Sequence, residues 1–101
     1  MTTKPVELSP QTTRRLDMLF PPVTREEARR LLTDECGSGL PLSGDITPAS
    51  LERVRFAALK VSDGRIEKLK QAIELAKADW RDLLVDAGFA HDPAAHKSWL
   101  V

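Results

Sequence analysis

The strongest constraint on the fold is a hydrophobic repeat that runs from Ser62 to Ala87. Its apolar positions recur at steps of three and four residues: Ile66, Leu69, Ile73, Ala76, Trp80, Leu83 and Ala87. At about 100° per residue, these side chains fall within one narrow sector of a helix. Gly88 then provides a helix stop, and Phe89 stands where a Schellman motif places an apolar contact near Leu84. The repeat predicts one amphipathic helix of about 24 residues, which spans ~36 Å.

Capping signals predict three shorter helices upstream of this repeat. Ser9-Pro10 is typical of a helix start, and Pro21-Pro22 ends that first helix. The segment from Thr24 to Glu27 fits a capping box for a second helix, and Gly37 follows as its stop. Thr47-Pro48 begins a third helix by the same logic as the first. No segment alternates as a half-buried strand would, so the sequence predicts an all-α fold.

The third helix is apolar on two sides. One stripe consists of Leu51, Val54, Ala58 and Val61, whereas Phe56 and Leu59 lie on roughly the opposite side. A helix of this kind is usually buried between neighbours, which would make it the central element of the domain. The alternative is that the side with Phe56 and Leu59 faces a partner chain.

The connections between the predicted helices complete the expected architecture. Ser62-Asp63-Gly64 is a tight turn, so the third and fourth helices should form an antiparallel hairpin. Asp92-Pro93 opens a short C-terminal helical turn. We therefore expect a small four-helix, bundle-like domain over residues 9–101, after a disordered or loosely attached lead of residues 1–8. The loop over residues 37–46 is either a spacer or a functional loop.

The overall charge argues against a dedicated nucleic-acid binder. Fifteen basic residues balance fifteen acidic ones, whereas proteins that bind nucleic acids usually carry a basic excess. The N-terminal segment has no apolar stretch typical of a signal peptide, and no apolar run approaches the ~20 residues of a membrane span. We therefore expect a cytoplasmic protein without a membrane partner.

The sequence offers little for catalysis or metal binding. Cys36 is the single cysteine, and His91 and His96 are the only histidines. A nucleophile and base, or a metal site, could form only if these residues met in space. The two histidines are five residues apart, unlike the i,i+4 pair that places two ligands on one helix face. We expect no cofactor, and an enzyme or metal site near Cys36 and the tail histidines is a disfavoured alternative.

Arginine is concentrated in the first three predicted helices, at Arg14, Arg15, Arg25, Arg29, Arg30, Arg53 and Arg55. If these side chains shared one surface, weak contact with the phosphates of a nucleic acid would follow. Acidic residues are interleaved with them, which is typical of solvated helix faces joined by salt bridges. Weak nucleic-acid binding is thus an alternative hypothesis and not the leading one.

An acidic flank beside the apolar seam of the fourth helix is the main candidate for a functional surface. Asp79, Asp82 and Asp86 share it with Leu75, and the aspartates repel one another by about a few tenths of a kcal/mol per pair. Arg53 and Lys60 of the third helix could neutralise the flank from within the domain. Alternatively, the flank faces a basic partner protein.

The leading hypothesis is a small non-catalytic protein that acts through protein–protein interaction or as an accessory factor. Its candidate interaction surface consists of Leu75, Asp79, Asp82, Asp86, Phe56 and Leu59. We expect a protein partner and favour a monomer, because the Ala-rich and Trp-containing seam suits packing within the domain better than a Leu zipper. A homodimer is the alternative.

Overall fold

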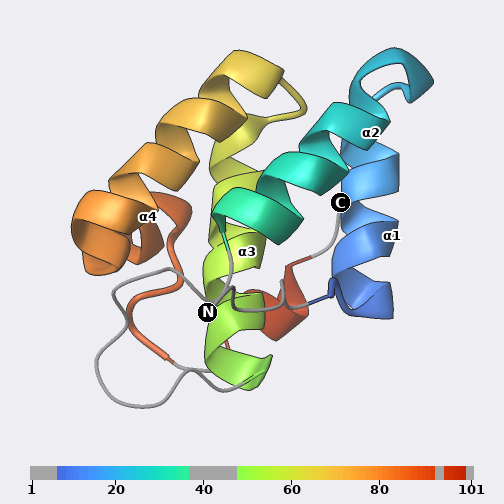
Figure 1. The fold of residues 1–101 in the computed structure, drawn as a ribbon. Helices are drawn as coiled ribbons and strands as arrows, with labels where there is room; N and C mark the ends of the chain where they lie inside the picture. The colour runs from blue at the N-terminus through green and yellow to red at the C-terminus, as the bar shows by residue number, and fades with distance from the viewer. Residues whose placement is uncertain (1–6, 37–47, 93–94, 100–101) are drawn as a thin grey trace, which may run out of the picture.

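The computed structural model describes residues 7–36, 48–92 and 95–99, and this part of the chain contains helices and no strand (Figure 1). The helices are α1 (Pro10–Leu19), α2 (Pro22–Arg30), the π-helical turn η1 (Leu31–Glu35), α3 (Pro48–Ser62), α4 (Ile66–Ala87) and the 3₁₀ turn η2 (Ala95–Ser98). The all-α prediction is therefore confirmed. Most of the predicted lead and the whole loop of residues 37–46 lie outside the described residues.

Helix α1 begins as its capping signal predicts. The Oγ of Ser9 accepts a hydrogen bond from the backbone N–H of Thr12 at 3.2 Å, and Pro10 occupies the first helical position. The helix buries Leu16 completely, and Phe20, directly after its end, is also buried. The two prolines that follow cannot continue the α1 hydrogen bonds, so the chain turns at this point into α2.

Helix α2 begins two residues before the predicted capping box. Pro22 is its first residue, and the backbone N–H groups of Thr24 and Arg25 both donate to the carbonyl of Pro21 at 3.0 Å. Pro22 has its φ angle preset for a helix, so it starts the helix without a side-chain cap. Thr24 thus lies inside the first turn, and its prediction as the N-cap was wrong.

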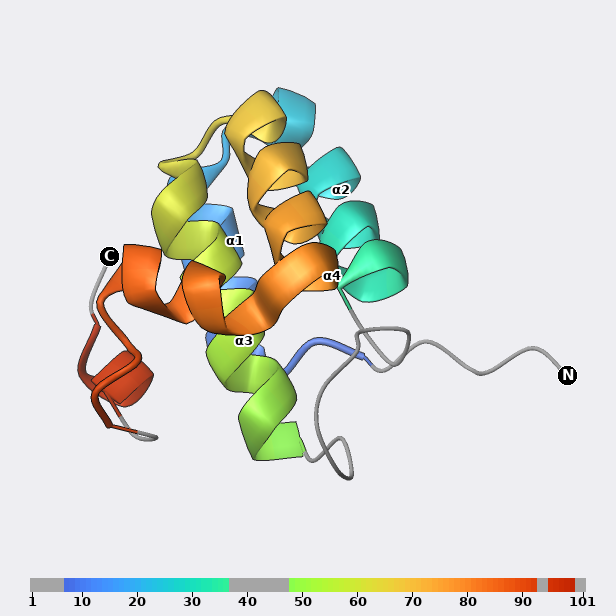
Figure 2. The same cartoon turned by 90° about the vertical axis from the view of Figure 1, so that its left-hand side faces the viewer.

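Helices α3 and α4 form the predicted antiparallel hairpin, and they pack against each other more extensively than any other pair of elements (Figures 1 and 2). Helix α3 continues through Ser62, whose Oγ donates to the carbonyl of Leu59 at 2.6 Å. The turn consists of Asp63 and Gly64, both with positive φ. Ser62 therefore ends α3 and is not part of α4, which begins at Ile66.

Helix α3 lies at the centre of the domain, as its two apolar sides predict. Side chains from both sides are almost completely buried: Leu51, Val54, Phe56, Ala57, Ala58 and Leu59. Helix α4 covers one side, while α1 and η2 contact α3 from other directions. This arrangement explains why a helix apolar on two sides is stable here: each side has a neighbouring element to pack on.

Helix α4 is bent and not one straight helix. Asp79 has φ −157° and ψ 94°, an extended conformation that interrupts the helix, and Figure 2 shows the last turns running in a different direction from the first. The Oδ1 of Asp79 accepts a hydrogen bond from the backbone N–H of Arg81 at 3.1 Å, so Asp79 caps residues 80–87 as a new helical segment. In the segment beyond the bend, Leu83 and Leu84 are buried.

The end of α4 is as predicted. Gly88 adopts φ 79°, and the N–H of Phe89 donates to the carbonyl of Leu84 at 2.9 Å. The N–H of Gly88 donates to the carbonyl of Val85 at 3.0 Å, which completes a Schellman motif. Phe89 is buried, and its ring reaches the aromatic residues of the C-terminal turn.

Candidate interaction surface

The three aspartates of the predicted acidic flank are exposed, but the bend divides them. Asp79 serves as the internal cap of α4, whereas Asp82 and Asp86 lie one turn apart on the segment beyond it. Leu75, on the other side of the bend, is half-buried and packs against the core. The predicted flank assumed a straight helix, so only Asp82 and Asp86 remain together on one exposed face.

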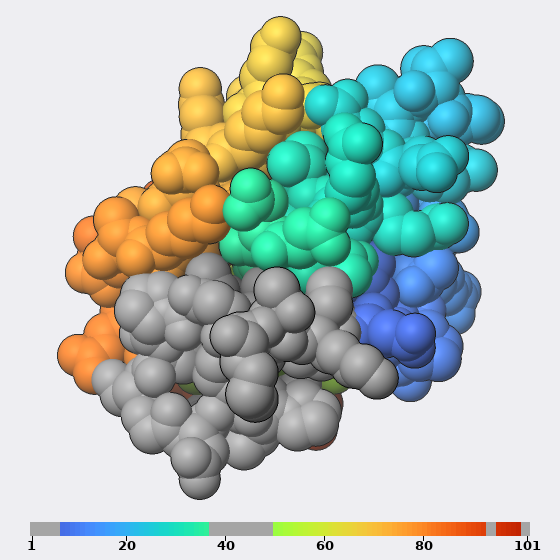
Figure 3. Space-filling model, in the orientation of Figure 1, coloured from blue at the N-terminus to red at the C-terminus, as the bar shows by residue number. Residues whose placement is uncertain are grey.

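Val85 is the residue of this surface that the sequence analysis missed. It directly precedes Asp86 in the same turn and is 63% exposed, although it has a large apolar side chain. An aliphatic residue outside the seam of an amphipathic helix was the available signal. We call Asp82, Val85 and Asp86 the acidic face of α4, and these last turns form the left-hand edge of the molecule in Figure 3.

The cations predicted to neutralise this face are used elsewhere. The Nζ of Lys60 donates to the carbonyl of Ala87 at 2.8 Å, and Nη2 of Arg53 donates to the carbonyl of Phe89 at 2.7 Å. The last carbonyls of a helix lack intrahelical donors and carry partial negative charge, so the carbonyl of Ala87 attracts Lys60. The expected pairing with the aspartates is therefore corrected, and no ion pair in the described segments includes Asp82 or Asp86.

The first half of α4 differs from its last turns in this respect. Lys77 pairs with Glu35 of η1 at 3.0 Å, and Lys70 pairs with Glu27 of α2 at 3.6 Å. Figure 3 shows the surfaces of α4 and η1 adjoining at this place. The hydrogen bond to Glu35 is the main cause that raises the pKa of Lys77. Charges are therefore matched between elements before the bend, in contrast to the acidic face beyond it.

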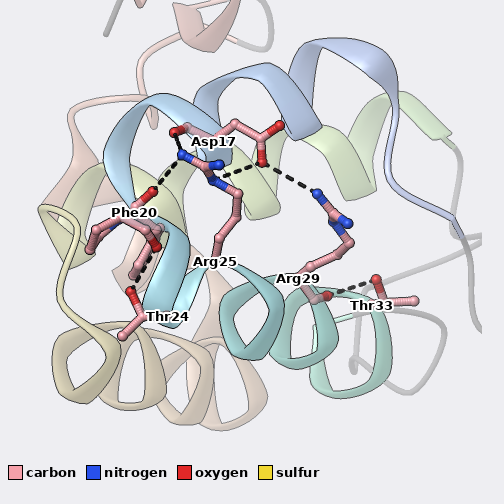
Figure 4. A network of polar contacts seen from close by, with 7 residues as sticks. Asp17, Phe20, Thr24, Arg25, Arg29 and Thr33 are labelled. Atoms are coloured by element: carbon pink, nitrogen blue, oxygen red, sulfur yellow. Dashed lines mark hydrogen bonds and ion pairs between the residues drawn. The ribbon is translucent and has the colours of Figure 1, made fainter.

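Several arginines bind backbone carbonyls inside the domain. Arg25 donates to the carbonyls of Asp17 and Phe20 at the end of α1, at 2.9 and 3.2 Å (Figure 4). Arg55 donates to the carbonyl of Cys36 at 2.8 Å, and Arg15 donates to that of Trp99 at 2.9 Å. These bonds stabilise the ends of helices in the way that a C-terminal cation does.

This use of arginine bears on the nucleic-acid hypothesis. Arg55 is 2% exposed, and its burial lowers the pKa of the guanidinium below the ordinary value. Arg29 forms an ion pair with Asp17 at 3.3 Å. Arg14 of α1 and Arg30 of α2 are exposed, and neither takes part in an ion pair within the described segments. The described residues thus present no continuous arginine surface.

Phe56 and Leu59 lie in the interior and not on an exposed surface. Phe56 is 2% exposed, and its ring lies 5.2 Å from that of His96 and 6.0 Å from that of Trp99. The guanidinium of Arg15 lies 4.3 Å from the Phe56 ring centre. Leu59 is completely buried. Both residues therefore belong to the core, and we correct their assignment to the candidate interaction surface.

The residues considered for catalysis lie in different surroundings. Cys36 is buried, and burial raises the pKa of its thiol to about 12 despite the opposing charges of Arg55 and Lys77. Such a thiol stays protonated near neutral pH and is a poor nucleophile. His96 is buried among aromatic rings, and His91 is exposed. Within residues 7–36, 48–92 and 95–99, no group of three acidic, histidine or cysteine side chains is arranged to hold a metal ion.

In comparisons with known proteins, no family model, curated protein or solved structure matches the chain. Among the described helices, none combines the length and the apolar character that crossing a bilayer requires. The candidate surface therefore depends on the geometry of α4 alone.

Proposed function

We propose that this chain is a small non-catalytic interaction domain that binds a positively charged segment of another protein through the acidic face of α4. The observation that carries the proposal is the contrast across the bend. Lysines of the first half of α4 pair with acidic residues of α2 and η1, whereas Asp82 and Asp86 flank an exposed valine without an ion pair in the described chain.

The chemistry of this face indicates what would bind to it. Two carboxylates one turn apart repel each other by about a few tenths of a kcal/mol, and basic side chains would relieve that repulsion. Val85 offers an apolar contact beside them, which favours a partner with an aliphatic side chain next to its lysines or arginines. Because the charges are exposed, we expect a modest affinity that falls as the salt concentration rises.

The competing functions have less support. Nucleic-acid binding would need arginines that instead bind carbonyls within the domain, and an acidic face repels phosphates. An enzyme built on Cys36 would need an accessible thiolate, which the burial of this residue disfavours. A cytoplasmic location and a role as an accessory factor remain predictions that accompany the proposal.

A photo-crosslinking amino acid in place of Val85, expressed in the native cells, tests the proposal. We expect a discrete adduct whose partner peptide is rich in lysine or arginine. Asp82→Asn with Asp86→Asn removes two ion pairs of roughly 0.5 kcal/mol each, so adduct formation should fall about fivefold. The matched control is Glu26→Gln with Asp34→Asn, which neutralises two exposed carboxylates of α2 and η1.

Each outcome of this experiment bears directly on the proposal. A basic adduct that is lost with the α4 double variant and retained with the control supports it. The absence of any adduct, an adduct with the chain itself, or an adduct that both double variants affect equally would overturn it.

A further inference from the structure

Glu52 of α3 joins the two ends of the described chain. The Oγ of Ser9 donates a hydrogen bond to Oε1 of Glu52 at 2.5 Å, and Nε2 of His96 lies 4.0 Å from Oε2 of the same carboxylate. Ser9 is also the N-cap of α1, where its Oγ accepts from the backbone N–H of Thr12. One carboxylate thus contacts the cap of the first helix and the imidazole of the last helical turn.

The imidazole of His96 lies in a confined place. His96 is 1% exposed, and its ring stands edge-on to the rings of Phe56 and Phe89, at centroid distances of 5.2 and 6.3 Å. The Glu52 side chain is 22% exposed, so it connects this interior to solvent. Inside such a site, a change of charge acts on its neighbours more strongly than on the surface.

The other charged groups around this site are engaged with the same C-terminal segment. Arg15 of α1 donates to the carbonyl of Trp99, and Arg53 of α3 donates to the carbonyl of Phe89. Lys97 of η2 and Asp92, which precedes it, are exposed. The Glu52 carboxylate forms an ion-pair contact with His96. A charge on the imidazole therefore acts directly on this carboxylate.

We propose that the protonation of His96 is transmitted through Glu52 to the Ser9 cap of α1. The protonated imidazole attracts Oε2 and holds the carboxylate in place, so that Oε1 remains aligned with the Ser9 hydroxyl. Loss of the proton removes this attraction and loosens the bond between Glu52 and Ser9. The start of α1 and the C-terminal turn would then respond to pH as one coupled pair, although 86 residues separate Ser9 from His96 in the sequence numbering.

An NMR titration of the full chain between about pH 5 and 8.5 tests the coupling. We expect the imidazole signals of His96 and the amide signals of Ser9, Thr12 and Thr13 to change with one shared midpoint. The exposed His91 is the internal control, because its own titration should leave these amides unchanged. Glu52→Gln should lower the His96 midpoint by about one pH unit and remove the response at α1.

A second variant separates the two halves of the link. Ser9→Ala should leave the His96 midpoint unchanged and abolish the shared transition at Thr12 and Thr13, since it removes only the contact with α1. The proposal is overturned if His96 does not titrate in the folded protein. It is equally overturned if the α1 amides follow His91, or if they keep their transition in the Ser9→Ala variant.

Discussion

Gly64 lies in the turn between α3 and α4, at the point where this turn comes close to the end of α1. It has φ +77°, and a Cβ atom at this position would lie 2.5 Å from the carbonyl oxygen of Leu19. Both the backbone conformation and the contact with α1 therefore exclude a side chain. Gly88 provides a comparison, because it has φ +79° but meets only the flexible end of Lys60 at 3.7 Å.

We predict that Gly64→Ala destabilises the domain more than Gly88→Ala does. The Gly88 variant should lose about 1 kcal/mol of unfolding free energy through the backbone conformation. The Gly64 variant adds a clash with backbone atoms, so its loss should be larger by roughly 2 kcal/mol. Urea denaturation of both variants measures the difference, and equal losses would contradict the observed approach of α1 to the turn.

Cys36 gives a pH-dependent prediction at the same scale. Burial raises the pKa of its thiol from 9.0 to about 12, so the unfolded chain loses this proton at a lower pH than the folded chain. The resulting stabilisation is complete below pH 9 and is lost as the pH rises from 9 towards 12. Between pH 8 and 10, the wild type should lose about 1 kcal/mol more than Cys36→Ala. Parallel losses in urea titrations would refute this.

At the scale of the elements, α4 shows what a hydrophobic repeat does and does not predict. The repeat and Gly88 correctly indicated a long amphipathic helix and its Schellman end. They did not indicate the bend, because an aspartate inside a periodic segment is equally compatible with an exposed helical position. Beyond the bend, Leu83 and Leu84 are buried in the core, and the local sequence does not specify this tertiary contact.

Substitutions at Asp79 test its role as an internal cap. Asp79→Ala removes the acceptor for the N–H of Arg81, and we predict a loss of about 1 kcal/mol of unfolding free energy. Asp79→Asn keeps a side-chain oxygen and should lose much less. If the two variants lose the same amount in thermal or urea denaturation, the charge of Asp79 matters and its capping bond does not.

At the scale of the whole molecule, the exposed apolar side chains bear on the oligomeric state, which we expect to be a monomer. The large apolar side chains exposed on it are Met18, Val23 and Val85, which come from three different elements. A stable homodimer usually buries a contiguous apolar patch larger than three side chains provide.

We therefore expect light scattering after size exclusion to give the mass of one chain, 11.2 kDa, at concentrations up to about 100 μM. The mass should not change with salt concentration, because the acidic face is not expected to bind a second copy. A mass near that of two chains would support the homodimer alternative and would require a new interpretation of Val85.

Two of the three residues of the acidic face could be predicted from the sequence. Asp82 and Asp86 were found because their spacing places them on one helix face, and both are exposed. Leu75 and Asp79 were grouped with them only because the helix was taken as straight. Phe56 and Leu59 could not be assigned from the sequence, since a second apolar side fits equally a neighbour within the domain or a partner chain.

The sequence by itself determined the helical class, the α3–α4 hairpin and the end of α4, because local periodicity, proline and glycine control these features over a few residues. The tertiary structure decided the bend at Asp79, the start of α2 and the partners of the basic residues. Lys60 and Arg53 could each have bound a carboxylate. In the described structure they bind carbonyls at and beyond the end of α4, because folding brings these oxygens within reach of α3.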